Sequence, residues 1–137
     1  NTIVSTTRDE KFHIVFSANE RDPGQYYLYD ASKNPRVLTP FGQARPELDP
    51  ERMAPVKPVV YEARDTLPIP AYLTLPNDGV KGPRAAVVMP HGGPWVRDSL
   101  AFDLWAQFLA SRGHAVIQPN FRGSSGYGDR FEALGYG

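Results

Sequence analysis

The chain has 137 residues, of which 41% are hydrophobic and 22% charged; these values are ordinary for a globular protein, and the length alone predicts one domain. Its 15 Lys and Arg residues balance 15 Asp and Glu residues, which argues against nucleic acid or an anionic membrane as a partner. The absence of cysteine excludes disulfides, cysteine nucleophiles and thiolate metal sites, and it leaves the redox compartment open.

Neither a membrane span nor a secretory signal is visible. No apolar run approaches the roughly 18 residues of a membrane span, and Asn1 is followed by neither a basic nor an apolar leader stretch. The chain begins in strand-like sequence and ends in "EALGYG" without a stop signal. We therefore expect a piece of a longer polypeptide. We favour the cytoplasm as its compartment and leave the periplasm open.

Residues 1–48 read as a series of short strands rich in β-branched and aromatic residues, separated by polar turns. The strand segments are "TIVSTT", "FHIVFSA", "QYYLYDA" and "RVLT". Four strands of this length match one blade of a β-propeller. Any antiparallel meander fits equally well, because no second copy of the period is present.

Residues 42–58 contain four prolines and predict an extended linker with at most one helical turn. After it, "PVVYEA" and "IPAYLTLP" predict two antiparallel strands joined through "RDTL". "NDGVKGPR" then predicts a surface loop.

A parallel β-α-β unit is predicted from residue 85 onward. The continuous apolar runs 85–89 and 114–119 are typical of strands buried on both faces, and we expect them to be parallel neighbours. A helix is predicted over 100–112, with Ser99 or Asp98 capping its start and Gly113 closing its end. Its apolar stripe consists of Ala101, Leu104, Trp105, Phe108 and Leu109.

A glycine-rich loop follows each of these two strands, "PHGGPW" after the first and "NFRGSSGYG" after the second, and "DRFEAL" then begins another helix. In a parallel sheet, chemistry collects at the carboxyl ends of the strands. Gly92 and Gly93 allow positive φ and close approach of a ligand to a bare N–H, which suits an oxyanion hole. A tight strand-to-helix turn in any α/β protein fits "HGGP" equally well.

Together, "YEARDTLPIPAYLTLP", "VVMPHGGPWVRDS" and "WAQFLASRGHAVIQPNFRGSSGYGDRF" resemble the start of the catalytic domain of the prolyl oligopeptidase family. The resemblance covers residues 40–137 and is closest to the acylaminoacyl-peptidase and dipeptidyl-peptidase-like branch. It implies that residues 1–48 are the last blade of a β-propeller and that 49–137 are the first part of an α/β-hydrolase domain. Thr66 stands where the family usually has glycine, a departure that affects only the geometry of a hairpin.

The family implies a Ser–Asp–His triad, with the serine in a G-x-S-x-G turn after a fifth strand. No serine of the chain has that pattern: Ser125 has Gly123 two residues before it but Tyr127 two residues after it. We interpret Ser124 and Ser125 as loop residues. The 137 residues are therefore expected to carry an oxyanion loop without a nucleophile and to be inactive alone.

The remaining polar residues leave alternatives open. His13, His91 and His114 show no ligand spacing, so no metal is expected. For His91 we favour support of the oxyanion site over an ordinary turn or direct contact. Arg122 could bind a substrate carboxylate, although a structural ion pair is favoured. Trp95 could line a subsite or pack.

Arg97 and Asp98 are expected to form a solvated helix cap.

The resulting hypothesis is a fragment of a serine peptidase that cleaves short peptides through an acyl-enzyme and needs no cofactor. Gly93 N–H is the expected oxyanion donor, Gly92 supplies the turn and His91 braces it. The rest of the polypeptide, or another copy, is expected to complete the sheet, so a homo-oligomer stays open. The alternatives are a carboxylesterase of the same fold and a non-catalytic propeller-based binding module. Exopeptidase and endopeptidase action are not distinguished.

Overall fold

The computed structural model describes residues 1–93 and 95–136, so Pro94 of the first glycine-rich loop and Gly137 lie outside the described residues. The chain divides into two compact units. The first comprises Asn1–Met53 with Ala101–Asp103, and the second comprises Ala54–Leu100 with Leu104–Gly137. No helix within the described residues is long and apolar enough to cross a membrane.

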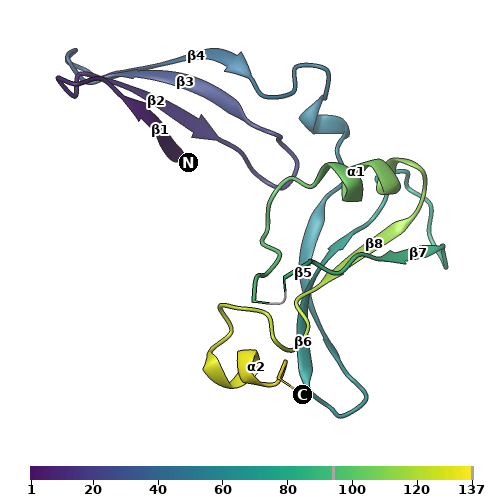
Figure 1. Ribbon diagram of the computed structural model, residues 1–137. Helices are drawn as coiled ribbons and strands as arrows, with labels where there is room; N and C mark the ends of the chain where they lie inside the picture. The colour runs from purple at the N-terminus through teal and green to yellow at the C-terminus, as the bar shows by residue number, and fades with distance from the viewer. Residues whose placement is uncertain (94, 137) are drawn as a thin grey trace. The chain divides into compact units, whose positions relative to one another are not determined.

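The first unit contains a four-stranded antiparallel meander in the order β1-β2-β3-β4 (Figure 1). The four predicted strands are confirmed. Whether this sheet is a propeller blade stays a prediction, since a single meander fits both interpretations. The strands are β1 (Thr2–Thr6), β2 (Phe12–Ser17), β3 (Gln25–Asp30) and β4 (Val37–Gln43).

The proline-rich linker contains one helical turn, the 3-10 helix η1 (Pro50–Arg52), which agrees with the prediction of at most one. The side chain of Asp49 caps it by accepting a hydrogen bond from the Glu51 N–H at 3.0 Å. Arg21 also holds this segment, because its guanidinium donates to the carbonyls of Met53 (3.1 Å) and Glu51 (2.8 Å). The linker is shorter than predicted, since β4 continues to Gln43 and the next strand begins at Val56.

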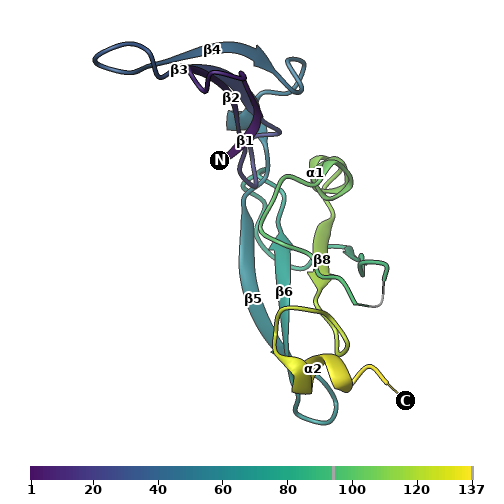
Figure 2. The same ribbon diagram turned by 60° about the vertical axis from the view of Figure 1, so that its left-hand side comes forward.

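The second unit is built on a mixed sheet in the order β5-β6-β8-β7. The hairpin β5–β6 is antiparallel as predicted, and in Figure 2 it extends past β8 toward its turn. β7 and β8 are parallel neighbours, with Ala86 opposite Ala115 and Val88 opposite Ile117, which confirms the predicted pairing. The strands are β5 (Val56–Glu62), β6 (Pro68–Thr74), β7 (Ala86–Val88) and β8 (Ala115–Pro119).

Helix α1 (Leu104–Ser111) connects β7 to β8 and differs from the prediction at its start. It begins at Leu104 instead of residue 100, so the predicted cap by Ser99 or Asp98 is wrong. The physical reason is that the Asn120 side chain binds the backbone of Asp98 and holds it in the loop. The end is as predicted: Gly113 has φ +89° and its N–H bonds the carbonyl of Ala110 at 3.0 Å.

The face of α1 that is buried is small and partly polar: Ala106, Gln107 and Ala110. Burial of the polar Gln107 side chain is possible because both of its polar groups are hydrogen-bonded. It accepts from Ala54 N–H (2.8 Å) and donates to Ala54 C=O (3.0 Å). Three large residues of the predicted stripe, Leu104, Trp105 and Phe108, are instead exposed, with Trp105 68% accessible. Leu109 is half-buried.

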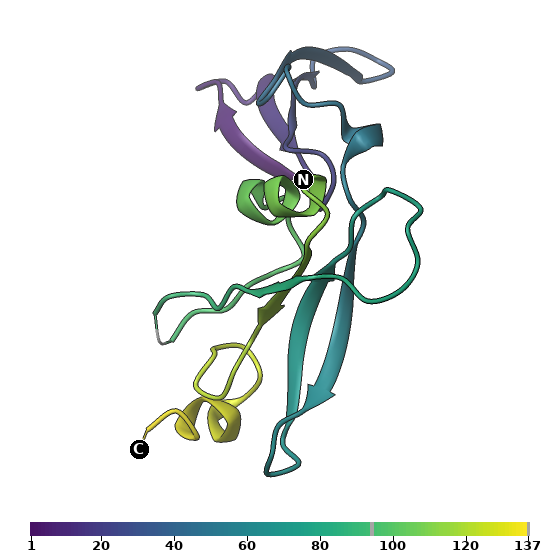
Figure 3. The ribbon, with the colours of Figure 1, turned by 90° about the vertical axis from the view of Figure 1, so that its right-hand side faces the viewer.

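Helix α2 (Asp129–Ala133) follows the second glycine-rich loop, as predicted, and lies at the opposite end of the second unit's sheet from α1 (Figure 3). The Gly123 N–H donates to the Phe131 carbonyl at 3.0 Å. Gly123 and Gly135 also approach closely: a Cβ added to Gly135 would lie 2.6 Å from the Gly123 Cα. This contact fixes the loop against the end of α2.

Candidate functional site

Two loops leave the same edge of the mixed sheet, the first loop (residues 90–98) after β7 and the second loop (residues 120–128) after β8. The two strands stay paired up to the loops, because Met89 N–H donates to Ile117 C=O at 2.9 Å. Parallel neighbours end at one edge, so the two loops lie where α/β proteins place their ligands.

Hydrogen bonds to backbone groups join the two loops. Asn120 accepts from the Asp98 N–H at 2.8 Å and donates to the Asp98 carbonyl at 3.1 Å. The Ser125 N–H donates to the Val96 carbonyl at 3.1 Å. Because Asn120 is fully buried, these bonds are shielded from water and fix the register of one loop against the other.

His91 forms the third connection, and it uses both ring nitrogens. Nδ1 lies 2.7 Å from the Gly92 carbonyl oxygen, and Nε2 lies 2.7 Å from Ser124 Oγ. The ring also stacks on Phe121, with centroids 4.4 Å apart and planes 17° apart. A carbonyl can only accept, so Nδ1 carries the proton and Nε2 of the neutral ring accepts from the Ser124 hydroxyl.

The two glycines of the first loop differ. Gly93 has φ +143°, and an added Cβ would lie 2.9 Å from Val96 Cγ2 and 3.1 Å from the Trp95 nitrogen. Only glycine fits this position without strain. Gly92 does not have positive φ, and an added Cβ there would meet nothing within 4 Å. Gly92 therefore does not use the positive φ that glycine allows, and its role in supplying the turn stays a prediction.

Arg122 forms the predicted ion pair. Its Nη2 lies 2.9 Å from the Asp65 carboxylate, which joins the second loop to the β5–β6 turn. The hydrogen bond from Arg122 holds the pKa of the Asp65 carboxyl below its usual value, and desolvation opposes this shift without reversing it. The guanidinium is therefore engaged in a structural contact, which agrees with the favoured interpretation.

Two further predicted residues lie at the edge of the first loop. Trp95 is 53% exposed and faces Tyr136, with ring centroids 6.0 Å apart. The Arg97 guanidinium lies over the Tyr127 ring at 5.8 Å from its centroid. The expected solvated helix cap of Arg97 and Asp98 is wrong, because these residues contact the second loop and the helix begins later.

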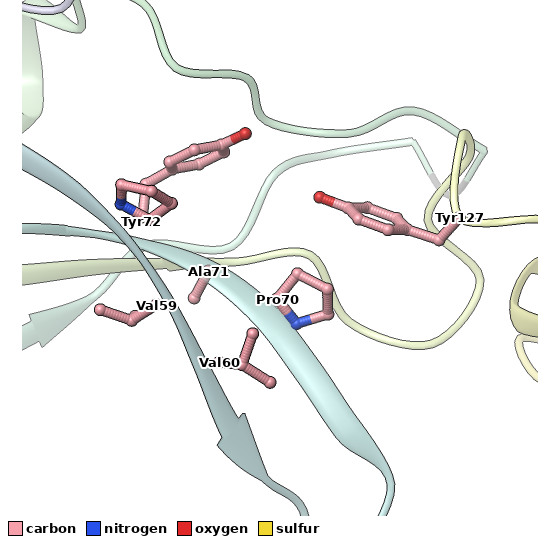
Figure 4. A pocket seen from close by; sticks show the side chains of 7 residues that line it. Val59, Val60, Pro70, Ala71, Tyr72 and Tyr127 are labelled. Atoms are coloured by element: carbon pink, nitrogen blue, oxygen red, sulfur yellow. The ribbon is translucent and has the colours of Figure 1, made fainter.

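A pocket lies beside the second loop, between the Tyr127 ring and the β5–β6 hairpin (Figure 4). The Tyr127 hydroxyl accepts from Asn120 Nδ2 at 2.8 Å, so the same amide that joins the loops also holds one wall of the pocket. Within the described residues, no group of three or more His, Cys, Asp or Glu could hold a metal ion. The pocket lining comprises Pro58, Val59, Val60, Pro70, Ala71, Tyr72 and Tyr127.

Sequence reasoning did not assign roles to Ser124 and Asn120, which are both fully buried between the loops. The sequence could have indicated a role for Asn120, because a polar residue directly after a buried parallel strand lies at the functional edge of the sheet. It could not have indicated a role for Ser124, since its partner His91 is 33 residues away.

A glycine-rich loop between a strand and the following helix is the arrangement that α/β-hydrolases use for an oxyanion hole. The comparisons agree with this class. The model of the prolyl oligopeptidase family matches residues 100–137. The chain is 40% identical to dipeptidyl aminopeptidase BIII of Pseudoxanthomonas mexicana over 143 aligned positions, which cover 99% of this chain and 20% of that protein.

Solved structures give the same result. The crystal structure of a puromycin hydrolase is 26% identical, with a TM-score of 0.66 over 88% of this chain and 19% of that one. An acylaminoacyl peptidase of Pyrococcus horikoshii shares the fold at 21% identity, with a TM-score of 0.65 over 95% of this chain and 20% of that one. The resemblance to the prolyl oligopeptidase family of serine peptidases that the sequence indicated is confirmed. The chain spans about one fifth of the length of these relatives.

Proposed function

We propose that the chain carries the oxyanion loop of a serine peptidase that cleaves short peptides, with the Gly93 N–H as one donor to the oxyanion. The observation that carries the proposal is the conformation of Gly93: a left-handed glycine in a braced loop at the carboxyl edge of the sheet. The names of two relatives, a dipeptidyl aminopeptidase and a puromycin hydrolase, support peptide-like substrates.

The proposal assigns residues 1–48 to the last blade of a propeller and 49–137 to the first part of the hydrolase domain. The Ser–Asp–His triad then comes from parts of the polypeptide outside these residues. In support, β7 has only β8 as a neighbour among the described strands, and α1 exposes Leu104, Trp105 and Phe108. Further strands and helices of the same polypeptide, or another copy, would cover this edge and this face.

The role of the loop follows from acyl transfer. The serine oxygen bonds to the substrate carbonyl carbon, and its proton passes to the histidine base. The carbonyl oxygen becomes an oxyanion, and a fixed N–H donor stabilises this charge without reorganising. The C–N bond then breaks, the amine leaves with the proton, and water hydrolyses the acyl-enzyme. Gly93 would act in both tetrahedral steps.

Replacement of Gly93 in the full-length polypeptide tests the proposal. Gly93→Pro removes the N–H and strains the turn, whereas Gly93→Ala strains the turn and keeps the N–H. We expect Pro to lower kcat by a further factor of roughly 10²–10³ relative to Ala, measured with short peptide anilides. Gly42→Ala in β4 is a control, because φ is not positive there and an added Cβ would meet no atom within 4 Å. Equal kcat for the Pro and Ala variants would overturn the assignment of Gly93.

A further inference from the structure

We infer that Ser124 is a positioning residue that acts through His91 to orient the Gly93 N–H. The inference rests on the proposed function and extends it to the second loop. Its starting point is a continuous series of hydrogen bonds from Ser124 Oγ to His91 Nε2 (2.7 Å) and from His91 Nδ1 to the Gly92 carbonyl (2.7 Å).

The His91 ring is fixed on three sides. The Ser124 hydroxyl, itself fully buried, occupies Nε2, the Gly92 carbonyl occupies Nδ1, and Phe121 stacks on one face. If the Ser124 hydroxyl is removed, Nε2 loses its hydrogen-bond donor and the ring loses one of the three contacts that fix its orientation. The bond to Gly92 then weakens as well, although Ser124 does not touch Gly92.

The Gly92 carbonyl and the Gly93 N–H belong to one peptide unit, which is planar and trans. Fixing the direction of the carbonyl oxygen therefore fixes the N–H, which points the opposite way. Glycine residues on both sides leave this peptide unit free to rotate about the neighbouring bonds. The hydrogen bond from His91 removes that freedom, and Ser124 keeps His91 in place to make it.

Ser124 is thus distinguished from Ser125, its neighbour in the same loop. Ser125 contacts the first loop through its backbone N–H, which donates to the Val96 carbonyl and does not depend on its side chain. Ser125→Ala is therefore the matched control for Ser124→Ala. Both variants remove one hydroxyl from the same loop, but only Ser124→Ala breaks the connection to His91.

The test uses the full-length polypeptide with short peptide anilides and a reversible peptide aldehyde, whose adduct places an oxyanion in the site. Ser124→Ala is expected to lower kcat about tenfold with KM nearly unchanged, and to weaken binding of the aldehyde by a similar factor. Ser125→Ala is expected to leave kcat and the affinity for the aldehyde within about twofold of the parent values. Ser124→Cys, which keeps a weak donor, is expected to fall between Ser124→Ala and the parent and serves if the alanine variant fails to fold.

A double-mutant cycle with Gly93→Pro separates this inference from the proposed function. If Ser124 acts through the Gly93 N–H, Ser124→Ala causes no further loss of kcat once Gly93 is proline. A purely structural role of Ser124 predicts an equal loss in both backgrounds, or a lower melting temperature with kcat unchanged, and either result overturns the inference. If Gly93→Pro behaves like Gly93→Ala, the proposed function itself is wrong.

Discussion

The Asn120 side chain forms a two-point hydrogen bond with the backbone of Asp98: the Asp98 N–H donates to Oδ1 at 2.8 Å and the Asp98 carbonyl accepts from Nδ2 at 3.1 Å. The two residues are 22 positions apart and belong to different loops. A side-chain amide matches a backbone peptide in this way because it offers one donor and one acceptor. The pair sets where the first loop ends, and it delays the start of α1.

Replacing Asn120 with alanine is expected to release the end of the first loop. The Asp98 N–H and carbonyl lose their buried partners, and each such group costs about 1–3 kcal/mol when left unsatisfied. Amide hydrogen exchange at Asp98 is the measurement, and we expect its protection to fall at least tenfold. Asn77→Ala, at an exposed position of the same unit, is the control. Unchanged protection at Asp98 would show that other contacts hold the loop.

Thr66 in the β5–β6 turn adopts φ +65°, a left-handed conformation that a β-branched residue adopts only with strain. Its N–H donates to the Ala63 carbonyl at 2.9 Å, so the turn is closed and cannot relax without breaking this bond. We expect Thr66→Gly to raise the free energy of unfolding by up to about 1 kcal/mol, since the relief of strain exceeds the entropy cost of glycine. Urea denaturation measures the change.

The control for this prediction is Thr39→Gly in strand β4, where φ is not positive. There glycine relieves no strain and adds freedom to the unfolded chain, so stability should fall by about 0.5–1 kcal/mol. A loss of stability at both positions would contradict the strain argument for Thr66.

The Asp65–Arg122 ion pair predicts a dependence on pH. The folded-state pKa of Asp65 is lowered, first by the hydrogen bond from Arg122, so the pair stabilises the fold above the ordinary aspartate pKa near about 4. This contribution is lost as pH falls through the lowered value. NMR titration of the side-chain carboxyl carbon is expected to give a pKa below the usual value, and Arg122→Gln should return it toward that value.

Asp78 serves as the control, because the pKa of its carboxyl is lowered by a different residue, Arg84. Its titration should not change when Arg122 is replaced. Should the Asp65 titration also stay the same, the ion pair would not be the cause of the shift.

The sequence predicted those parts of the structure that depend on neighbouring residues. Strands β7 and β8 were visible because continuous apolar runs of this length are typical of buried parallel strands. The expected burial holds for β8 but is wrong for β7, where Val88 is 66% exposed because β7 has only β8 as a neighbour among the described strands. The end of α1 was visible because Gly113 follows the last apolar position. The start of α1 was predicted wrongly. Asp98 has a side chain that is typical of a helix cap. Its backbone N–H and carbonyl are instead hydrogen-bonded to the side chain of Asn120, which lies in another loop.

The connection between His91 and Ser124 was also out of reach from the sequence. Nothing in "GSSGYG" separates Ser124 from Ser125; only the path of the second loop buries one and leaves the other partly accessible. The expected ion pair of Arg122 was found without its partner being named, since any acidic residue at the facing turn would satisfy a charge at the end of a strand. Contacts across 57 residues, such as Arg122 with Asp65, depend on the packing of a hairpin that local patterns do not place.

The last prediction concerns whether the 137 residues can attack a substrate. The pair of Ser124 and His91 has the distance of a nucleophile and its base, 2.7 Å. Two features argue against that role. Ser124 is fully buried, so no carbonyl carbon can reach its oxygen. His91 Nδ1 binds the Gly92 carbonyl, a neutral acceptor, and among the described residues no carboxylate bonds to the ring to stabilise the imidazolium that proton transfer would create. We therefore expect the 137-residue chain to hydrolyse no peptide anilide and to remain unlabelled by a serine-directed phosphonate, as judged by intact mass.

The full-length polypeptide is the control, and it should be labelled at another serine. Labelling of Ser124 itself would show that the hydroxyl reaches solvent and would replace its positioning role with a catalytic one.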